Sequence, residues 1–133
     1  MIVADTNLIA YLMVLGDRTP QAKTAFRRDP LWVAPPLWRS EFRNALAVSI
    51  RHGVLSLEQA VAAAQHAETL LAGKEFAVQS APVLTLALQS GCSACDCEFV
   101  ALATDLGVPL ITSDRTLAAK FPGIAVSLEA YAT

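Results

Sequence analysis

Apolar residues recur along the chain at two spacings, which separate the predicted strands from the predicted helices. Short, β-leaning apolar runs predict strands over residues 1–4, 31–34, 76–79, 108–112 and 124–126. Apolar positions three and four residues apart predict helices over residues 7–15, 20–28, 37–52, 56–72, 82–90, 94–106 and 115–120. We expect a loose tail after the last predicted strand.

Capping and helix-breaking residues agree with these boundaries. Ser56 and Gln59 have the spacing of a capping box, in which each side chain bonds the backbone N–H of the other residue. Pro35 and Pro36 interrupt the chain between a strand and a helix. Glycines follow four of the predicted helices, at positions 53, 73, 91 and 107.

Strands that alternate with helices form βαβ units, whose strands are parallel and whose connections are right-handed. The sequence therefore predicts an α/β fold, a three-layer sandwich with a parallel central sheet of four to five strands. The 133 residues suit one domain spanning residues 1–133. In such a sheet, ligands bind at the carboxyl ends of the strands.

Composition narrows the choice of partners. The chain is 54% hydrophobic and 17% charged, with a net charge of −2, so it has no overall attraction for polyanions. Binding to a nucleic acid must then rely on a local basic patch or on a bound metal ion. The first residues show no basic leader, and no apolar run is long enough to span a bilayer, so we expect a cytoplasmic protein.

Three cysteines, Cys92, Cys95 and Cys97, lie within six residues. Their odd number and close spacing make a poor disulfide framework, in agreement with a reducing compartment. A zinc site needs four ligands, and no histidine lies near. We interpret the cysteines as small packing residues, and a redox role for them stays a separate hypothesis.

Four acidic residues stand at positions that a solvated surface does not explain: Asp5, Glu41, Asp96 and Asp114. Asp5 and Asp114 follow predicted strands, Glu41 lies among apolar helix positions, and Asp96 lies in the first turn of a helix. Capping would explain Asp96 or Asp114 singly. The four together predict one site, whereas Asp17, Glu98 and Asp105 are expected to be surface charges.

Carboxylates that converge in a small cleft repel one another unless they share a cation. Oxygen-only ligands favour Mg²⁺ or Mn²⁺, and one or two such ions suit the hydrolysis of a phosphodiester by an activated water. Asp5, Asp96 and Asp114 are the expected metal ligands, and Glu41 is expected to belong to the same metal site by holding a metal-bound water, or to act as a base. Short polar neighbours that could orient ligands or bind phosphate are Thr6, Asn7, Thr112 and Ser113.

Basic and aromatic residues lie close to Glu41 in the sequence. Arg39 and Arg43 are one helical turn apart, and they are candidates for gripping RNA phosphates. Ion pairing with surface acids is the alternative role for them. Trp32 and Trp38 could stack on an unpaired base, although packing in the core or at an interface is the preferred interpretation.

With these residues in view, the sequence resembles the PIN-domain family, and within it the VapC-type toxins of bacterial toxin–antitoxin pairs. The resembling segments are IVADTNLIAYL, SEFRNALAVSIRHGVLS and CDCEFVALATDLGVPLITSDRTLAAKFP. The resemblance covers nearly the whole chain, and it maps the acidic quartet of the family onto Asp5, Glu41, Asp96 and Asp114. Family members often carry Tyr before and Ala after the third acid, where this chain has Cys95 and Cys97.

The resemblance implies a Mg²⁺- or Mn²⁺-dependent endoribonuclease, a homodimer, a cognate antitoxin protein and an RNA substrate such as tRNA or rRNA. Two alternatives compete with it. A Mg²⁺-binding phospho-receiver domain has paired acidic residues after its first strand, whereas here Asp5 is followed by Thr6, which does not fit that pattern. A catalytically silent PIN-like module that only binds a partner would have no need of the complete acidic quartet.

Overall fold

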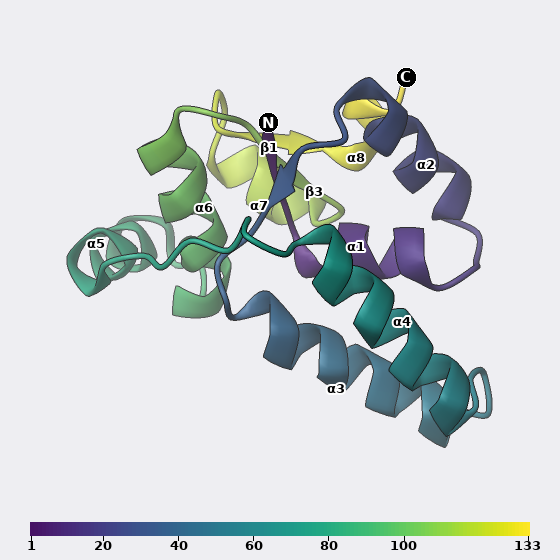
Figure 1. The fold of residues 1–133 in the computed structure, drawn as a ribbon. Coiled ribbons are helices and arrows are strands. Elements are labelled where there is room, and N and C mark those ends of the chain that lie inside the picture. Colours follow the sequence, from purple (N-terminus) through teal and green to yellow (C-terminus); the bar gives the residue numbers. More distant parts are fainter.

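A computed structural model describes residues 1–133, and a parallel sheet forms its centre (Figure 1). The strands are β1 (Ile2–Ala4), β2 (Trp32–Val33), β3 (Leu110–Thr112) and β4 (Ala125–Ser127). They lie in the order β2-β1-β3-β4, and all three pairings are parallel. The prediction of an α/β fold with a parallel sheet of four to five strands is confirmed, with four strands formed.

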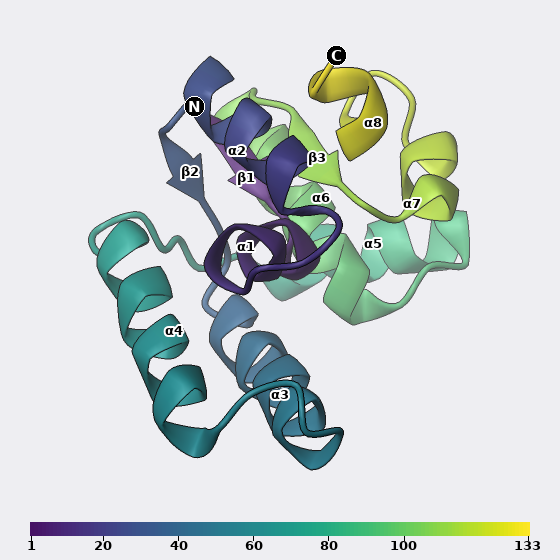
Figure 2. The ribbon, with the colours of Figure 1, turned by 90° about the vertical axis from the view of Figure 1, so that its right-hand side faces the viewer.

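Eight helices accompany the sheet: α1 (Thr6–Met13), α2 (Thr19–Arg28), α3 (Trp38–Arg51), α4 (Leu57–Leu70), α5 (Ser80–Ser90), α6 (Ala94–Leu106), α7 (Arg115–Lys120) and α8 (Leu128–Tyr131). In Figure 1, α5 and α6 lie on one side of the strands, and α1 and α2 lie on the other. Helices α3 and α4 form a hairpin that extends away from the sheet (Figure 2). None of the helices has both the length and the apolar character needed to cross a membrane.

Strands β1 and β2 are apolar along their whole length, and β3 and β4 are apolar up to their last residue, because helices cover both faces of the sheet. Every residue of β1 is buried, and so are Leu110 and Ile111 of β3. The large side chains of Trp32, Trp38 and Phe42 fill the space around them. Both tryptophans are therefore core residues, which confirms the packing interpretation and leaves neither ring accessible to a base.

Two predicted elements differ from the structure. Residues 76–79 form no strand, and only an isolated bridge between Ala34 and Glu75 joins this segment to the sheet edge. Phe76 is 38% exposed, so its apolar character does not signal a buried strand here. The expected loose tail is instead the short helix α8, because Ser127 caps it and Leu128 and Tyr131 are buried.

An ion-paired cluster fastens the start of α3 to the segment that carries this bridge. Arg39 donates to both carboxylate oxygens of Glu75, at 2.7 and 2.9 Å, and the Trp38 Nε1–H donates to the same carboxylate at 2.8 Å. Glu68 of α4 lies 3.5 Å from Arg39 and 3.9 Å from Arg43. Because Glu41 lies on the same turns of α3 as these arginines, the cluster also fixes where Glu41 stands.

The contribution of Glu75 to stability is expected to depend on pH. Hydrogen bonds from Arg39 hold the pKa of the Glu75 carboxyl below its usual value. The unfolded state then binds the proton more tightly, so the stabilisation is present at neutral pH and is lost as pH falls from the unfolded pKa of about 4.3 through the folded value. We expect Glu75→Gln to lower the Tm by a few degrees at pH 7. Thermal unfolding followed by circular dichroism should show this difference shrinking below about pH 4; a difference that stays constant would contradict the assignment.

Candidate active site

A pocket of about 320 Å³ at the carboxyl ends of β1 and β3 brings the four predicted acids together. Its lining consists of Asp5, Thr6, Asn7, Glu41, Asn44, Ala45, Asp96, Phe99, Thr112 and Asp114. We call it the acid pocket. Residues from α1, α3, α6 and the ends of two strands meet in it, and no lysine or arginine is among them. The negative charge gathered here has no compensating side chain.

Asp5 is the most firmly held of the four acids. It caps α1, where its Oδ1 accepts a hydrogen bond from the Leu8 N–H at 2.7 Å. Its Oδ2 accepts from the Thr112 hydroxyl at 2.7 Å and from the Ser113 N–H at 3.0 Å. Burial raises the pKa of the Asp5 carboxyl, and the hydrogen bond from Thr112 opposes that rise. Asp5 therefore links β1, α1 and the end of β3 through a single carboxylate.

Glu41 lies in the first turn of α3 and points toward α1. The Thr6 hydroxyl donates to its Oε1 at 2.7 Å. Burial raises the pKa of the Glu41 carboxyl, and the negative charges of Asp96 and Glu98 add to the rise. Glu98 thus acts on the site electrostatically although it does not line the pocket. The sequence predicts a surface position for Glu98 because nothing in its spacing indicates that α6 brings it toward α3.

Asp96 and Asp114 differ in the hydrogen bonds that their carboxylates accept. Ser93, rather than Asp96, caps α6, since its hydroxyl accepts from the Asp96 N–H at 3.0 Å. The Asp96 carboxylate accepts no hydrogen bond. Asp114 does cap α7, and its Oδ1 accepts from the N–H groups of Thr116 and Leu117. Its other oxygen has no hydrogen-bond partner, so capping and ligand binding can coexist at Asp114.

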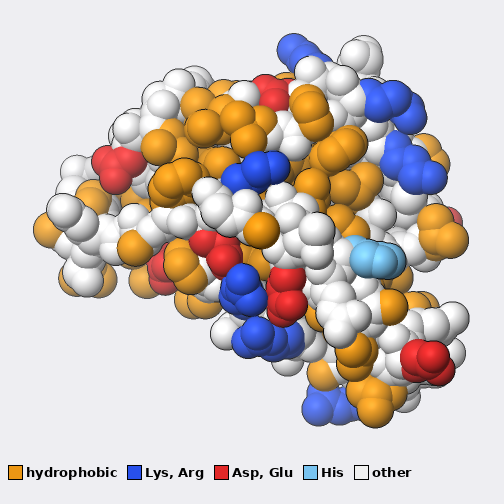
Figure 3. All heavy atoms as spheres, viewed as in Figure 1, with side chains coloured by type: hydrophobic (Ala, Val, Ile, Leu, Met, Phe, Trp, Pro, Cys, Tyr) orange, Lys and Arg blue, Asp and Glu red, His pale blue; other side chains and the backbone are white.

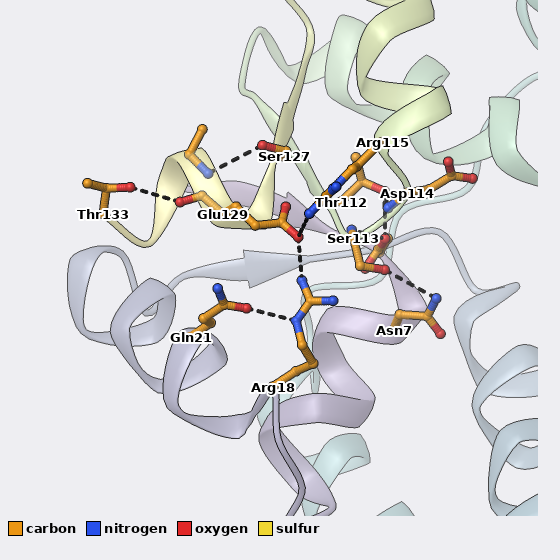
Figure 4. Close-up of polar contacts among 12 residues, drawn as sticks. Asn7, Arg18, Gln21, Thr112, Ser113, Asp114, Arg115, Ser127, Glu129 and Thr133 are labelled. Atoms are coloured by element: carbon orange, nitrogen blue, oxygen red, sulfur yellow. Dashed lines mark hydrogen bonds and ion pairs between the residues drawn. The ribbon is translucent and has the colours of Figure 1, made fainter.

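The predicted polar neighbours lie around these acids. Thr6 and Thr112 bond Glu41 and Asp5 directly, and the Asn7 amide donates to the Ser113 hydroxyl at 3.3 Å (Figure 4). Asn44 also lines the acid pocket, and sequence reasoning missed it. Its place three residues after Glu41, one helical turn away, is the signal that could have found it.

Arg39, Arg43 and the cysteines lie outside the acid pocket. The two arginines pair with Glu75 and Glu68, so the structure shows them in the ion-pairing role that the sequence left open. No disulfide forms among the cysteines: Cys97 is buried, Cys92 is half-buried and Cys95 is exposed. Burial raises the pKa of the Cys97 thiol, which leaves it protonated and unreactive at neutral pH.

The acid pocket suits a hard divalent cation in its chemistry. In their present positions, no three His, Cys, Asp or Glu side chains are arranged to hold an ion. The donors are nevertheless all oxygens, without nitrogen or sulfur, which is the ligand set of Mg²⁺ and Mn²⁺. The raised pKa values of Asp5 and Glu41 show carboxylates that a cation would stabilise in their charged forms.

The sequence of this chain is similar to that of a known ribonuclease. The chain is 32% identical over 126 residues to ribonuclease VapC3 from Pyrobaculum aerophilum, across 92% of this chain and 96% of that protein. No protein-family model matches it.

Two crystal structures share the fold. PAE2754 from Pyrobaculum aerophilum superposes with a TM-score of 0.78 at 20% identity, over 98% of this chain and 85% of that one. FitAcB from Neisseria gonorrhoeae superposes with a TM-score of 0.72 at 16% identity, over 97% and 99%. Together with the sequence identity, which extends over nearly the full length of both proteins, this shows that the chain belongs to the VapC family of PIN-domain proteins.

Proposed function

We propose that this protein is a divalent-metal-dependent endoribonuclease, the toxin of a toxin–antitoxin pair, and that it hydrolyses phosphodiester bonds of RNA at the acid pocket. The convergence of four carboxylates from separate elements in one pocket without a basic residue carries this proposal. The relation to ribonuclease VapC3 supports the choice of RNA as substrate. Family membership speaks against the phospho-receiver alternative.

We assign the metal-binding role to Asp5, Asp96 and Asp114, with Mg²⁺ or Mn²⁺ as the ion, bound singly or as a pair. Such an ion supplies Lewis acidity, which lowers the pKa of water and neutralises charge on the phosphate. Asp5 provides a carboxylate whose position is fixed by hydrogen bonds to Leu8, Thr112 and Ser113. Asp96 provides one that no protein donor occupies.

Glu41 is assigned the role of general base. A base works best when its pKa approaches the working pH, and burial together with two nearby carboxylates raises the pKa of Glu41. The hydrogen bond from Thr6 holds one oxygen in place and leaves the other available to accept a proton from water. We assign to Asn7, which lines the acid pocket, and to Ser113, which accepts its hydrogen bond, the role of donors to a phosphate or a ribose hydroxyl.

The partners follow from the same assignment. We propose that a cognate antitoxin protein blocks the acid pocket and that the protein acts as a homodimer, as the family resemblance implies. An antitoxin that presents a cation to the acid pocket would find four carboxylates and no competing lysine or arginine. The substrate is proposed to be an exposed loop of tRNA or rRNA, because unpaired bases are the usual targets of sequence-selective RNA-binding proteins.

Removal of divalent ions is expected to abolish activity. Purified protein incubated with total tRNA or rRNA and Mg²⁺ or Mn²⁺ should release discrete fragments, resolved on a denaturing gel. An excess of chelator should stop the cleavage, and added Mn²⁺ should restore it, because the four carboxylates repel a phosphate unless a cation lies between them. Cleavage that persists in chelator would overturn the metal assignment. Intact RNA under all conditions would favour a silent, partner-binding module.

A further inference from the structure

Three adjoining pockets form a row that leads from the acid pocket to α2, and we call this row the trough. The acid pocket shares Asn7 and Ala45 with a second pocket of about 310 Å³ between α1 and α3, which we call the middle pocket. The middle pocket in turn shares three lining residues with a third pocket of about 410 Å³, the basic pocket: Leu15, Gly16 and Thr19. Neighbouring pockets therefore share part of their walls.

The middle pocket offers flat and apolar surfaces of the kind that hold a nucleobase. Tyr11 lines it and is half-buried, and the Arg18 guanidinium lies 5.2 Å from the centre of the Tyr11 ring. Hydrogen bonds to Gln21, at 2.8 Å, and to Glu129, at 2.9 Å, hold that guanidinium in place (Figure 4). Aromatic rings and arginine planes are the groups on which unstacked bases rest.

The basic pocket presents cations that the protein leaves without an acidic partner. Lys23 and Arg27 lie one helical turn apart on α2, both exposed, and neither forms a salt bridge. The only hydrogen bond of the Arg27 side chain is a long one, of 3.4 Å, to Thr24. Figure 3 shows lysine and arginine side chains gathered over α2. Asp17 is the one acidic residue that lines either outer pocket.

The acid pocket, the middle pocket and the basic pocket follow one another as a phosphate, a base and the next phosphate do in a nucleic-acid strand. We propose that the trough binds a single RNA strand, with one phosphate at the acid pocket, the neighbouring base in the middle pocket and a further phosphate at Lys23 and Arg27. This inference rests on the proposed endoribonuclease function and adds the path of the strand across the protein and the place of one unpaired base. A protein segment is the competing occupant, but it carries no regular alternation of phosphate and base.

A binding assay with one matched pair of variants tests the basic end. Arg27 and Arg51 are both exposed arginines in the last turn of a helix, so Arg27→Glu and Arg51→Glu change the charge equally, and only Arg27 lines the trough. Each is made in the otherwise wild-type protein, and the anisotropy of a fluorescein-labelled 12-nucleotide single-stranded RNA is measured in Ca²⁺, a hard oxygen-binding cation used in place of Mg²⁺ so that the strand is bound without being cleaved. We expect Arg27→Glu to weaken binding about tenfold or more and to reduce the salt slope by about 0.7 for each phosphate that the protein no longer neutralises, with Arg51→Glu unchanged.

A second comparison tests the base in the middle pocket. An oligonucleotide that is abasic throughout keeps every phosphate, and it should bind about tenfold more weakly than the intact strand. Ser49 lines the middle pocket and neither of the other two, so Ser49→Trp should fill that pocket only. We expect this substitution to remove most of the difference in affinity between the intact and the abasic strand. Circular dichroism checks that the variant is folded.

The outcomes separate this inference from the proposed function. Equal binding by Arg27→Glu and Arg51→Glu would overturn the trough, even if the wild-type protein cleaves RNA. Equal binding of intact and abasic strands would overturn the base assignment and favour a protein segment as the occupant. If the wild-type protein cleaves no RNA, the proposed function fails, and the two binding comparisons still decide the trough.

Discussion

Replacement of Asp96 by Asn is expected to lower the rate of RNA cleavage by about 1,000-fold, or ~4 kcal/mol in the activation barrier, without unfolding the protein. We expect the fold to be kept because the Asp96 carboxylate accepts no hydrogen bond from the protein and because Ser93, not Asp96, caps α6. Asn keeps the size and removes the charge. The measurement is the single-turnover rate with Mn²⁺, beside the Tm of both proteins.

Asp105→Asn is the matched control for Asp96→Asn. Asp105 is exposed on the same helix, lies outside the acid pocket and forms no salt bridge, so the same change of charge should leave the cleavage rate within about twofold. Equal effects of the two substitutions would mean that general charge, and not a ligand at position 96, controls the reaction. A large fall in the Tm of Asp96→Asn would assign Asp96 a structural role instead.

The second large effect is expected at Asp5, where Asp5→Ala should lower the free energy of unfolding by about 3 kcal/mol in addition to abolishing cleavage. This change leaves the Leu8 N–H, the Thr112 hydroxyl and the Ser113 N–H without their acceptor. Loss of a helix cap costs about 1 kcal/mol, and each buried donor left unsatisfied costs about 1–3 kcal/mol. Relief from burying a charge offsets part of that sum.

Asp5→Asn separates the two roles of this residue. The amide oxygen can still cap α1, and the Thr112 hydroxyl can rotate to accept from the amide nitrogen, so only the Ser113 N–H is left without an acceptor and we expect a loss of about 1 kcal/mol. Cleavage should be lost in both variants because both remove the charge. Urea denaturation in chelator measures the two stabilities. If Asp5→Ala proved as stable as the wild-type protein, the hydrogen bonds of Asp5 would not hold β1 to the end of β3.

The fold was predictable where local signals and burial agree. Helices α6 and α7 have the predicted bounds residue for residue, because Ser93 and Asp114 cap them. Gly107, in a left-handed conformation, ends α6. The prediction of a strand over residues 76–79 was wrong because a short apolar run has the same sequence pattern whether it pairs in a sheet or passes along the sheet edge. In the tail, the capping residue Ser127, which marks the start of α8, was overlooked in the sequence.

The candidate site was predictable in its membership but not in its internal contacts. Strand ends converge in a parallel sheet, which was enough to bring Asp5 and Asp114 together. The partners that decide the state of each acid come from distant parts of the chain: Thr112 lies 107 residues from Asp5, and Thr6 lies 35 residues from Glu41. No local pattern encodes such pairs. For the same reason the bond between Arg39 and Glu75 could not be foreseen.

The trough depends even more on tertiary structure. Lys23 and Arg27 are an ordinary basic pair in the sequence, and Tyr11 is one aromatic residue on an apolar helix. Only the packing of α1 against α2 and α3 joins their pockets to the acid pocket.

The central claim is that the four acids share a divalent cation. Crystals of the wild-type protein grown with Mn²⁺, with diffraction recorded at the manganese absorption edge, test it most directly. We predict an anomalous difference peak inside the acid pocket, surrounded by carboxylate oxygens of Asp5 and Asp96, and no such peak in crystals of Asp96→Asn grown in the same way. A peak elsewhere on the protein, or none in wild-type crystals whose dissolved protein cleaves RNA, would contradict the claim.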